Sequence, residues 1–175
     1  MSALPALSQK IPACASSLRN CALLTLTLGQ QTGWALQKRD GEITQGSIAF
    51  RPSDFEGEGM GYLRFRYWLD DMAKKAGGLD AVIFADIRIH SSTQLAVVYG
   101  GFLAHLTAWC EWRQVPYIGA SMSDVRKLVI GTDDIGQQSL IDALRRRGYI
   151  TVTKDTAGAL ALLEWALHYK ARGNA

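Results

Sequence analysis

The stretch LLTLTLGQQTGWAL, residues 23–36, predicts a strand that runs through a glycine turn into a second strand. Three leucines alternate with Thr25 and Thr27, so one face of the first strand is apolar and the other carries hydroxyl groups. This alternation predicts a half-buried strand. Gly29 and Gly33 flank Gln-Gln-Thr, a spacing that suits a tight turn with close backbone approach.

The second threonine of this strand stands at a chemically informative position. In many nucleic-acid and nucleotide enzymes such a strand carries an Asp that holds Mg²⁺, and the glycine turn after it approaches phosphate. Thr27 occupies that position here. Because a hydroxyl is neutral and a poor sole ligand for a divalent cation, the sequence predicts that a charge is missing.

Length and composition predict one globular domain. The chain has 175 residues, of which 48% are hydrophobic and 20% charged, which is typical of soluble proteins with a sizeable core. No apolar run approaches the roughly 18 residues that cross a bilayer, so no membrane segment is expected. The net charge of +3 is compatible with nucleic-acid binding and too small to require it.

The amino-terminal end and the cysteines bear on domain limits and compartment. Residues 1–20 are rich in Ala and Ser and lack acids, so they fit either a transit peptide or a flexible tail, and the scarcity of Arg favours the tail. The folded domain is then expected over residues 21–172. Three cysteines without a C-x-x-C pair predict reduced thiols in a cytoplasmic protein.

The rest of the chain predicts strands first and then alternating helices and strands. Residues 62–76 predict a helix that turns Leu63, Tyr67 and Met72 toward a core, and Gly77-Gly78 ends it. The remaining expected elements are strands at 22–29, 33–38 and 42–50, buried strands at 80–87 and 115–119, a linker or single turn at 121–127, an extended piece at 149–153, and helices from 92 or 93 to 112, 135–147 and 156–171.

These elements define an α/β fold. Asp40-Gly41 predicts a hairpin between the second and third strands, which indicates an antiparallel meander. Three antiparallel strands followed by two parallel strands form a mixed sheet with helices on both faces, the layout of the RNase H-like fold.

Five segments together carry a more specific resemblance. They are LTLGQQTGWAL at 26–36, VIFADIRIH at 82–90, VYGGFLA at 98–104 with WCE at 109–111, DVRKLVIG at 124–131, and AGALALLEWA at 157–166. In this order and with these loop lengths, the chain resembles the RuvC-like Holliday junction resolvases from about residue 22 to residue 169.

The resemblance implies two-metal phosphodiester hydrolysis by four carboxylates, because Mg²⁺ takes hard oxygen ligands. The four positions that match the family's acids are uncharged in this chain: Thr27, Ala85, Thr156 and Gly158. Asp86 and Asp155 are possible displaced acids, although Asp86 needs a strand bulge and Asp155 also suits a helix N-cap. We therefore expect no cofactor, with Mg²⁺ only if the displaced acids act.

Basic residues offer candidate nucleic-acid contacts. The resemblance implies a phosphate-binding segment that retains Arg126 and Lys127, but Asp133 and Asp134 follow it and Gln137 replaces an expected lysine. Other candidates are Lys38 and Arg39 at the hairpin and Arg145, Arg146 and Arg147 at a helix end. The three arginines have an alternative role, since cations at a helix C-terminus stabilise its dipole.

The helix at 93–112 carries Tyr99, Phe102, Leu106 and Trp109 at helical spacing, and Gly100-Gly101 leave its middle without side chains. Such a glycine pair usually marks close approach by another element. Two interpretations stay open: packing on the protein's own sheet, or a homodimer interface, which the resemblance implies.

The sequence predicts a catalytically inactive RuvC-like protein that binds branched or duplex DNA, or a regulatory partner, as a dimer. One alternative is an active, metal-dependent junction endonuclease that uses displaced acids. A second alternative is a dimeric regulator that contacts only proteins. No small-molecule substrate is expected.

Overall fold

The computed structural model describes residues 18–88, 91–131, 136–150 and 152–169. A 3₁₀ turn at Leu18–Asn20 precedes the first strand, and the elements then follow in this order: β1 (Leu23–Thr27), β2 (Gln31–Gln37), β3 (Ile43–Ala49), α1 (Gly59–Lys75), β4 (Ala81–Asp86), α2 (Thr93–Arg113), β5 (Tyr117–Ser121), α3 (Met122–Ile130), α4 (Gln137–Arg146) and α5 (Lys154–Tyr169).

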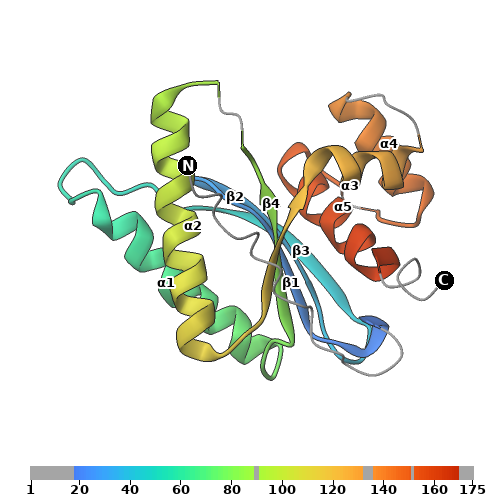
Figure 1. Ribbon diagram of the computed structural model, residues 1–175, viewed down its shortest axis with the longest axis horizontal. Helices are drawn as coiled ribbons and strands as arrows, with labels where there is room; N and C mark the ends of the chain where they lie inside the picture. Colours follow the sequence, from blue (N-terminus) through green and yellow to red (C-terminus); the bar gives the residue numbers. More distant parts are fainter. Residues whose placement is uncertain (1–17, 89–90, 132–135, 151, 170–175) are drawn as a thin grey trace, which may run out of the picture.

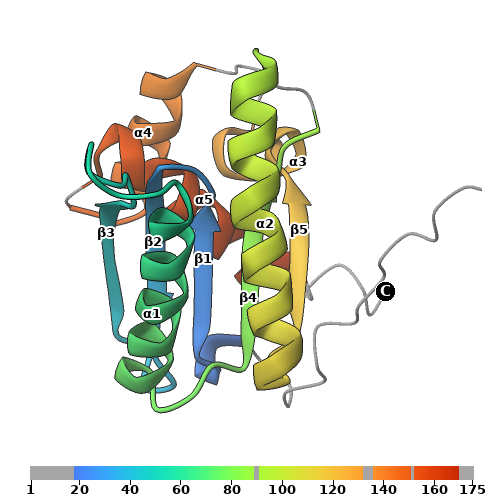
Figure 2. The same ribbon diagram turned by 90° about the vertical axis from the view of Figure 1, so that its left-hand side faces the viewer.

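The five strands form one mixed sheet in the order β3-β2-β1-β4-β5 (Figure 2). The pairs β1–β2 and β2–β3 are antiparallel, whereas β1–β4 and β4–β5 are parallel. Helices α1 and α2 cover one face, and α3, α4 and α5 lie on the other (Figure 1). The predicted RNase H-like architecture is confirmed. None of the described helices is both long enough and apolar enough to cross a membrane.

The sheet separates two hydrophobic cores, and β1 contributes to both. Leu24 and Leu26 pack toward α1 and α2, while Leu23 packs toward α5. The prediction of a half-buried β1 is wrong, because Thr25 on the second face is fully buried. Its hydroxyl donates to the Ala159 carbonyl oxygen of α5 at 2.7 Å, which compensates the burial of a polar group.

Helix α1 begins three residues earlier than predicted, and of the three side chains predicted to face the core only Met72 does so. Phe65, Leu69 and Met72 are buried, whereas Leu63 is 40% and Tyr67 63% exposed. The sequence offered two overlapping sets of apolar residues at helical spacing, and only the set with Phe65 and Leu69 meets the sheet. The predicted stop is confirmed, since both glycines after the helix have positive φ.

Helix α2 begins where the sequence predicts. Ser92 has extended backbone angles, and its side chain accepts a hydrogen bond from the Leu95 amide, which is an N-cap. At the other end, Gln114 adopts the left-handed conformation with φ of 55°. A polar residue therefore caps each end of the helix.

The segment after α2 differs from the prediction. Strand β5 begins at Tyr117, two residues later than expected. Residues 122–130 form a helix rather than a linker or a single turn, because Val125 and Val129 bury one face and Gly131, with φ of 82°, ends it. Residues 149, 150, 152 and 153 form no strand.

The folded domain begins earlier than residue 21. Leu18 is buried, and the Gln37 side chain donates to the carbonyl oxygens of Leu18 at 2.9 Å, Arg19 at 3.3 Å and Cys21 at 3.0 Å. The end of the predicted tail is thus part of the core, and residues 1–17 lie outside the described chain. Cys21 and Cys110 are buried, and neither forms a disulfide within the described residues.

The glycine pair in α2 marks a close approach by α1, as the sequence predicts. A Cβ on Gly101 would overlap the hydroxyl end of Tyr62, whereas a Cβ on Gly100 would meet nothing within 4 Å. Tyr62 lies over Gly101 and stacks on His105, with ring centroids 4.9 Å apart. Packing therefore explains the missing side chain of Gly101 and not that of Gly100.

We expect Gly100→Ala and Gly101→Ala to have opposite effects on stability. Gly100→Ala should raise the free energy of unfolding by about 0.5–1 kcal/mol, because alanine favours the helix and meets no neighbour. Gly101→Ala should lower it by about 1–2 kcal/mol, because Tyr62 must leave its place. Urea denaturation of both variants tests this, and equal effects would contradict the α1–α2 contact.

Candidate functional site

The resemblance matches four positions of this chain to the acids of a resolvase. These positions lie at the carboxyl ends of β1 and β4 and at the start of α5. Thr27 ends β1, and the parallel register that pairs Leu26 with Phe84 makes Ala85 its next neighbour. A Cβ on Gly158 of α5 would lie 2.7 Å from the Thr27 methyl carbon. The structure thus brings Thr27, Ala85 and Gly158 together on the α5 side of the sheet.

The fourth position, Thr156, contributes to the cap of α5. The Thr153 amide donates to the Thr156 hydroxyl oxygen at 3.0 Å, and the Thr156 amide donates to the Thr153 hydroxyl oxygen at 3.3 Å. This reciprocal pair has the form of a capping box. Thr153, not Asp155, is therefore the N-cap, and Asp155 lies exposed in the first turn.

The backbone of α5 packs closely on the sheet at these positions. A Cβ on Gly33 of β2 would overlap the carbonyl oxygen of Asp155, so the first turn of α5 lies directly over β2. The Gly33 amide donates to the Thr27 hydroxyl oxygen at 3.1 Å. Gly33, Thr27 and Gly158 therefore form a tight contact between sheet and helix, with Ala85 buried beside it.

Asp86 lies on the opposite face of β4 from Ala85. Residues 81, 83 and 85 pack in the α5-side core, and residues 82 and 84 pack on the α1 and α2 side. Strand alternation therefore directs Asp86 away from Thr27 and Gly158, and the regular pairing of β4 with β5 shows no bulge. The Asp86 carboxylate accepts instead from the Arg88 guanidinium at 3.0 Å.

The residues at this end of the sheet do not fit a pair of divalent ions. Thr27, Thr156, Ala85 and Gly158 supply two hydroxyl oxygens and no charge, and both hydroxyls already have partners. In the described ranges, no three His, Cys, Asp or Glu residues cluster so that they could hold a metal. These residues therefore do not support a catalytic step through a metal ion.

Lys38 and Arg39 lie at the opposite end of the sheet. Because Gln37 pairs with the first residue of β1, the β2–β3 hairpin lies at the amino end of β1. Lys38 forms an ion pair with Glu42, and the Arg39 guanidinium forms one with Asp80 at 2.8 Å. Both cations therefore have ion-pair partners of their own, and their contact with nucleic acid stays a prediction.

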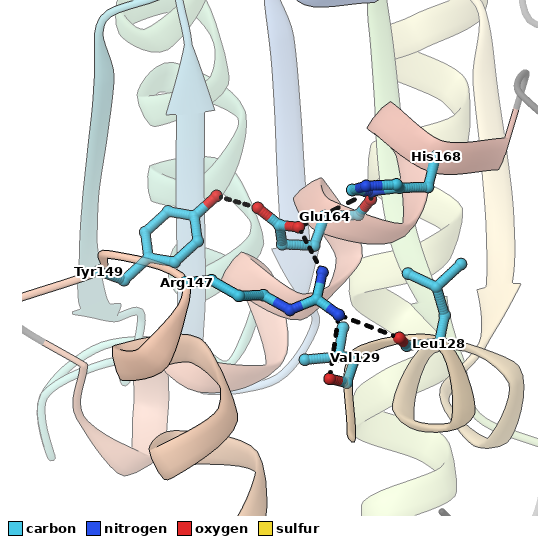
Figure 3. Close-up of polar contacts among 6 residues, drawn as sticks. All are labelled: Leu128, Val129, Arg147, Tyr149, Glu164 and His168. Atoms are coloured by element: carbon cyan, nitrogen blue, oxygen red, sulfur yellow. Dashed lines mark hydrogen bonds and ion pairs between the residues drawn. The ribbon is translucent and has the colours of Figure 1, made fainter. Parts of the chain in front are cut away.

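Arg147 joins three helices, as Figure 3 shows. Its guanidinium donates to the Leu128 and Val129 carbonyl oxygens at the end of α3, each at 3.1 Å, and to Glu164 of α5 at 2.8 Å. Arg147 therefore has a structural role, and its contact with nucleic acid stays a prediction.

The Glu164 carboxylate accepts hydrogen bonds from both Arg147 and Tyr149. The Tyr149 hydroxyl donates to Glu164 at 2.7 Å, and His168 lies next to it on α5 (Figure 3). Burial raises the pKa of Tyr149, and the hydrogen bond to Glu164 raises it further. Glu164 gives no signal in the sequence beyond that of an isolated acid among the Ala and Leu residues of α5.

Of the remaining basic candidates, Arg126 is half-buried and Lys127, Arg145 and Arg146 are exposed. The Arg126 guanidinium lies 3.4 Å from the Gln137 side-chain oxygen. The Gln137 amide in turn donates to the Lys154 carbonyl oxygen at 3.1 Å, which connects α4 with the start of α5. Asp133 and Asp134 lie outside the described residues.

The four apolar residues proposed for a dimer interface are buried within the chain itself. Tyr99 is 7% exposed, and Phe102, Leu106 and Trp109 are 2% exposed or less. The packing interpretation is therefore the right one for these residues, and they are not available to a second copy. Helical spacing could not distinguish the two cases, because both place apolar residues on one face.

Comparison with solved structures identifies the architecture. The chain is similar to Thermus thermophilus RuvC in complex with a Holliday junction substrate, with a TM-score of 0.71 and 14% identity over 86% of this chain and 96% of that chain. The fold is that of RuvC. A second Thermus thermophilus RuvC structure gives a TM-score of 0.69 at 14% identity, again over 86% and 96% of the two chains.

The RuvC-like fold also extends to a mitochondrial relative. The yeast mitochondrial Holliday junction resolvase has a TM-score of 0.57 and 13% identity, over 90% of this chain and 82% of that chain. No protein-family model matches the chain, and no curated protein sequence matches it. At these identities the likeness defines the fold, and the chemistry must be argued from the residues.

We expect the Gly158–Thr27 contact to appear in a double-mutant cycle. Gly158→Ala should lower the free energy of unfolding by about 1–2 kcal/mol, because its Cβ meets the Thr27 methyl group. In a Thr27→Ser background, which keeps the hydroxyl, Gly158→Ala should instead be neutral or stabilise by up to about 1 kcal/mol. Additive effects in urea denaturation would show that helix and strand are less tightly packed here.

Proposed function

We propose that this chain is a catalytically inactive RuvC-like protein that binds branched or duplex DNA. The observation that carries the proposal is the tight contact of Thr27, Gly33 and Gly158, which occupies the place of a metal site. An acid at position 158 would first have to displace the Thr27 methyl group. The chemistry of the remaining groups points the same way.

Charge supports the inactive state. Two divalent ions bring four positive charges, which a protein site normally balances with carboxylates. The site positions offer none, and Asp86 lies on the other face of β4. Asp155 is exposed on α5, and a single carboxylate is too little to hold two ions. These facts favour the inactive protein over an endonuclease with displaced acids.

The support for nucleic-acid binding comes from the neighbours and from α3 and α4. One of the structural neighbours is described in complex with a Holliday junction substrate. In this chain, Arg147 holds the end of α4 against the end of α3, and the exposed Lys127, Arg145 and Arg146 lie close to that junction in sequence. Basic side chains at adjoining helix ends suit contacts to backbone phosphates.

The first prediction from this proposal is that the protein does not cleave DNA. A labelled four-way junction incubated with the protein in Mg²⁺ or Mn²⁺ should remain intact, while an active resolvase run in parallel cuts it. The Asp86→Asn and Asp155→Asn variants should behave as the unmodified protein does. Metal-dependent nicking that either variant abolishes would establish the endonuclease with displaced acids in place of this proposal.

The second prediction concerns the binding surface. Arg145→Ala/Arg146→Ala should weaken binding to duplex and junction DNA and reduce the slope of log K against log salt by about 2, because two phosphate contacts are lost. Lys74→Ala/Lys75→Ala is the matched control: it removes two cations from the end of α1, and each pair includes one ion pair at i,i+3 spacing. Equal losses in the two variants would contradict a specific surface on α4.

Dimer formation stays a prediction, and its contact must involve residues other than those first proposed. Tyr67 and Trp112 are 63% and 64% exposed on the outer side of α1 and α2, so a second copy could bury them. Sedimentation at roughly tens of micromolar should show a dimer. A monomer at that concentration would contradict it. A dimer without DNA binding would favour the regulator that contacts only proteins.

A further inference from the structure

A groove runs along the first turns of α2 on the face of the sheet opposite α5. It consists of two adjoining hollows of about 510 and 430 Å³, which share Gln30, Gln94 and Val98 in their linings. Volumes of this size are typical of small-molecule sites. The groove lies beside the β1–β2 turn, at the same end of the sheet as Thr27.

The groove combines apolar walls with polar groups at its edge. Its inner wall consists of core side chains, among them Leu28 and Tyr99 in one hollow and Phe50 and Phe102 in the other. Leu95, which is 53% exposed, adds an apolar outer wall. Apolar walls of this kind suit the faces of a flat aromatic molecule.

The polar side chains of the first hollow are three amides and one guanidinium, and Thr93 and Glu58 add a hydroxyl and a carboxylate to the second hollow. Gln30, Gln31, Gln94 and Arg51 line the groove, and none of these side chains forms a hydrogen bond or ion pair with another residue in the part of the chain that the structure describes. A glutamine amide offers one donor and one acceptor side by side. This pair matches the N7 acceptor and N6 amine of adenine, and a guanidinium matches a phosphate.

We propose that this groove binds an adenine nucleotide that has left the base stack of a bound nucleic acid. The base enters between the apolar walls, a glutamine amide pairs with its N6 and N7 edge, and Arg51 contacts its phosphate. The nucleic acid as the source rests on the proposed function, whereas the groove's complementarity to the nucleotide does not. An unstacked base is the form that a side-chain pocket can enclose.

The test uses adenosine 5′-monophosphate with the full-length, ¹⁵N-labelled protein. Amide resonances of residues 28–31 and 94–99 should shift on titration, and ribose 5-phosphate, which lacks the base, should bind about tenfold more weakly. Inosine 5′-monophosphate, which lacks the N6 amine, should also bind more weakly. Gln94→Trp fills the groove and should abolish the shifts, while Arg51→Ala should weaken binding of both phosphates.

Ala104→Trp is the matched control, because Ala104 is exposed on the same helix and lines neither hollow. It should bind the nucleotide as the unmodified protein does. Absence of shifts in the groove, or equal binding of ribose 5-phosphate, would overturn the proposal. Amide shifts that depend on protein concentration and not on nucleotide concentration would place a second copy of the chain in the groove, and they would also overturn the proposal. Nucleotide binding without DNA binding would refute the proposed function but would still support a nucleotide site in the groove.

Discussion

The hydrogen bond from the Thr25 hydroxyl to the Ala159 carbonyl oxygen joins the central strand to the last helix inside the core. It forms only when α5 lies very close to the sheet, and Gly33 and Gly158 provide the space for that approach. Helices α3 and α4 pack on α5 in turn. The position of the whole layer therefore depends on how closely one helix meets β1.

The residues of this close contact do not supply the charge that a two-metal site needs. Four carboxylates at the end of a sheet repel one another unless cations neutralise them, and they need room for the ions and their water. Thr27, Ala85 and Gly158 need neither, so the backbone of α5 packs against the strands without an intervening ion. The uncharged residues and the tight packing are two aspects of one arrangement.

Much of the fold could be predicted from local patterns. Alternation and the Asp40-Gly41 turn defined the antiparallel strands, and the glycines after α1 defined its end. Helix α3 was missed because its buried face rests on only Val125 and Val129. The prediction of the core face of α1 was wrong at Leu63 and Tyr67, because two sets of apolar residues overlap along the helix. Nothing in the local sequence decides which set meets the sheet.

The site was predictable only where a resemblance supplied positions. It located Thr27, Ala85 and Gly158, which do lie together, but it could not show the roles of charged side chains. Arg147 and Arg39 have partners 17 and 41 residues away in the chain, and only the fold brings those partners near. Long-range ion pairs leave no periodic signal, so an exposed cation and a structural one look alike in sequence.

The shared use of β1 has a consequence for cooperativity. Leu23 belongs to the core on the α5 side, and Leu24 and Leu26 belong to the core on the α1 and α2 side. If either helical layer separated from the sheet, β1 would lose part of its packing, and the other core would be weakened with it. The two layers should then unfold in a single transition, and amide hydrogens of β1 should exchange only with global opening. A chain with two cores thus behaves as one folding unit.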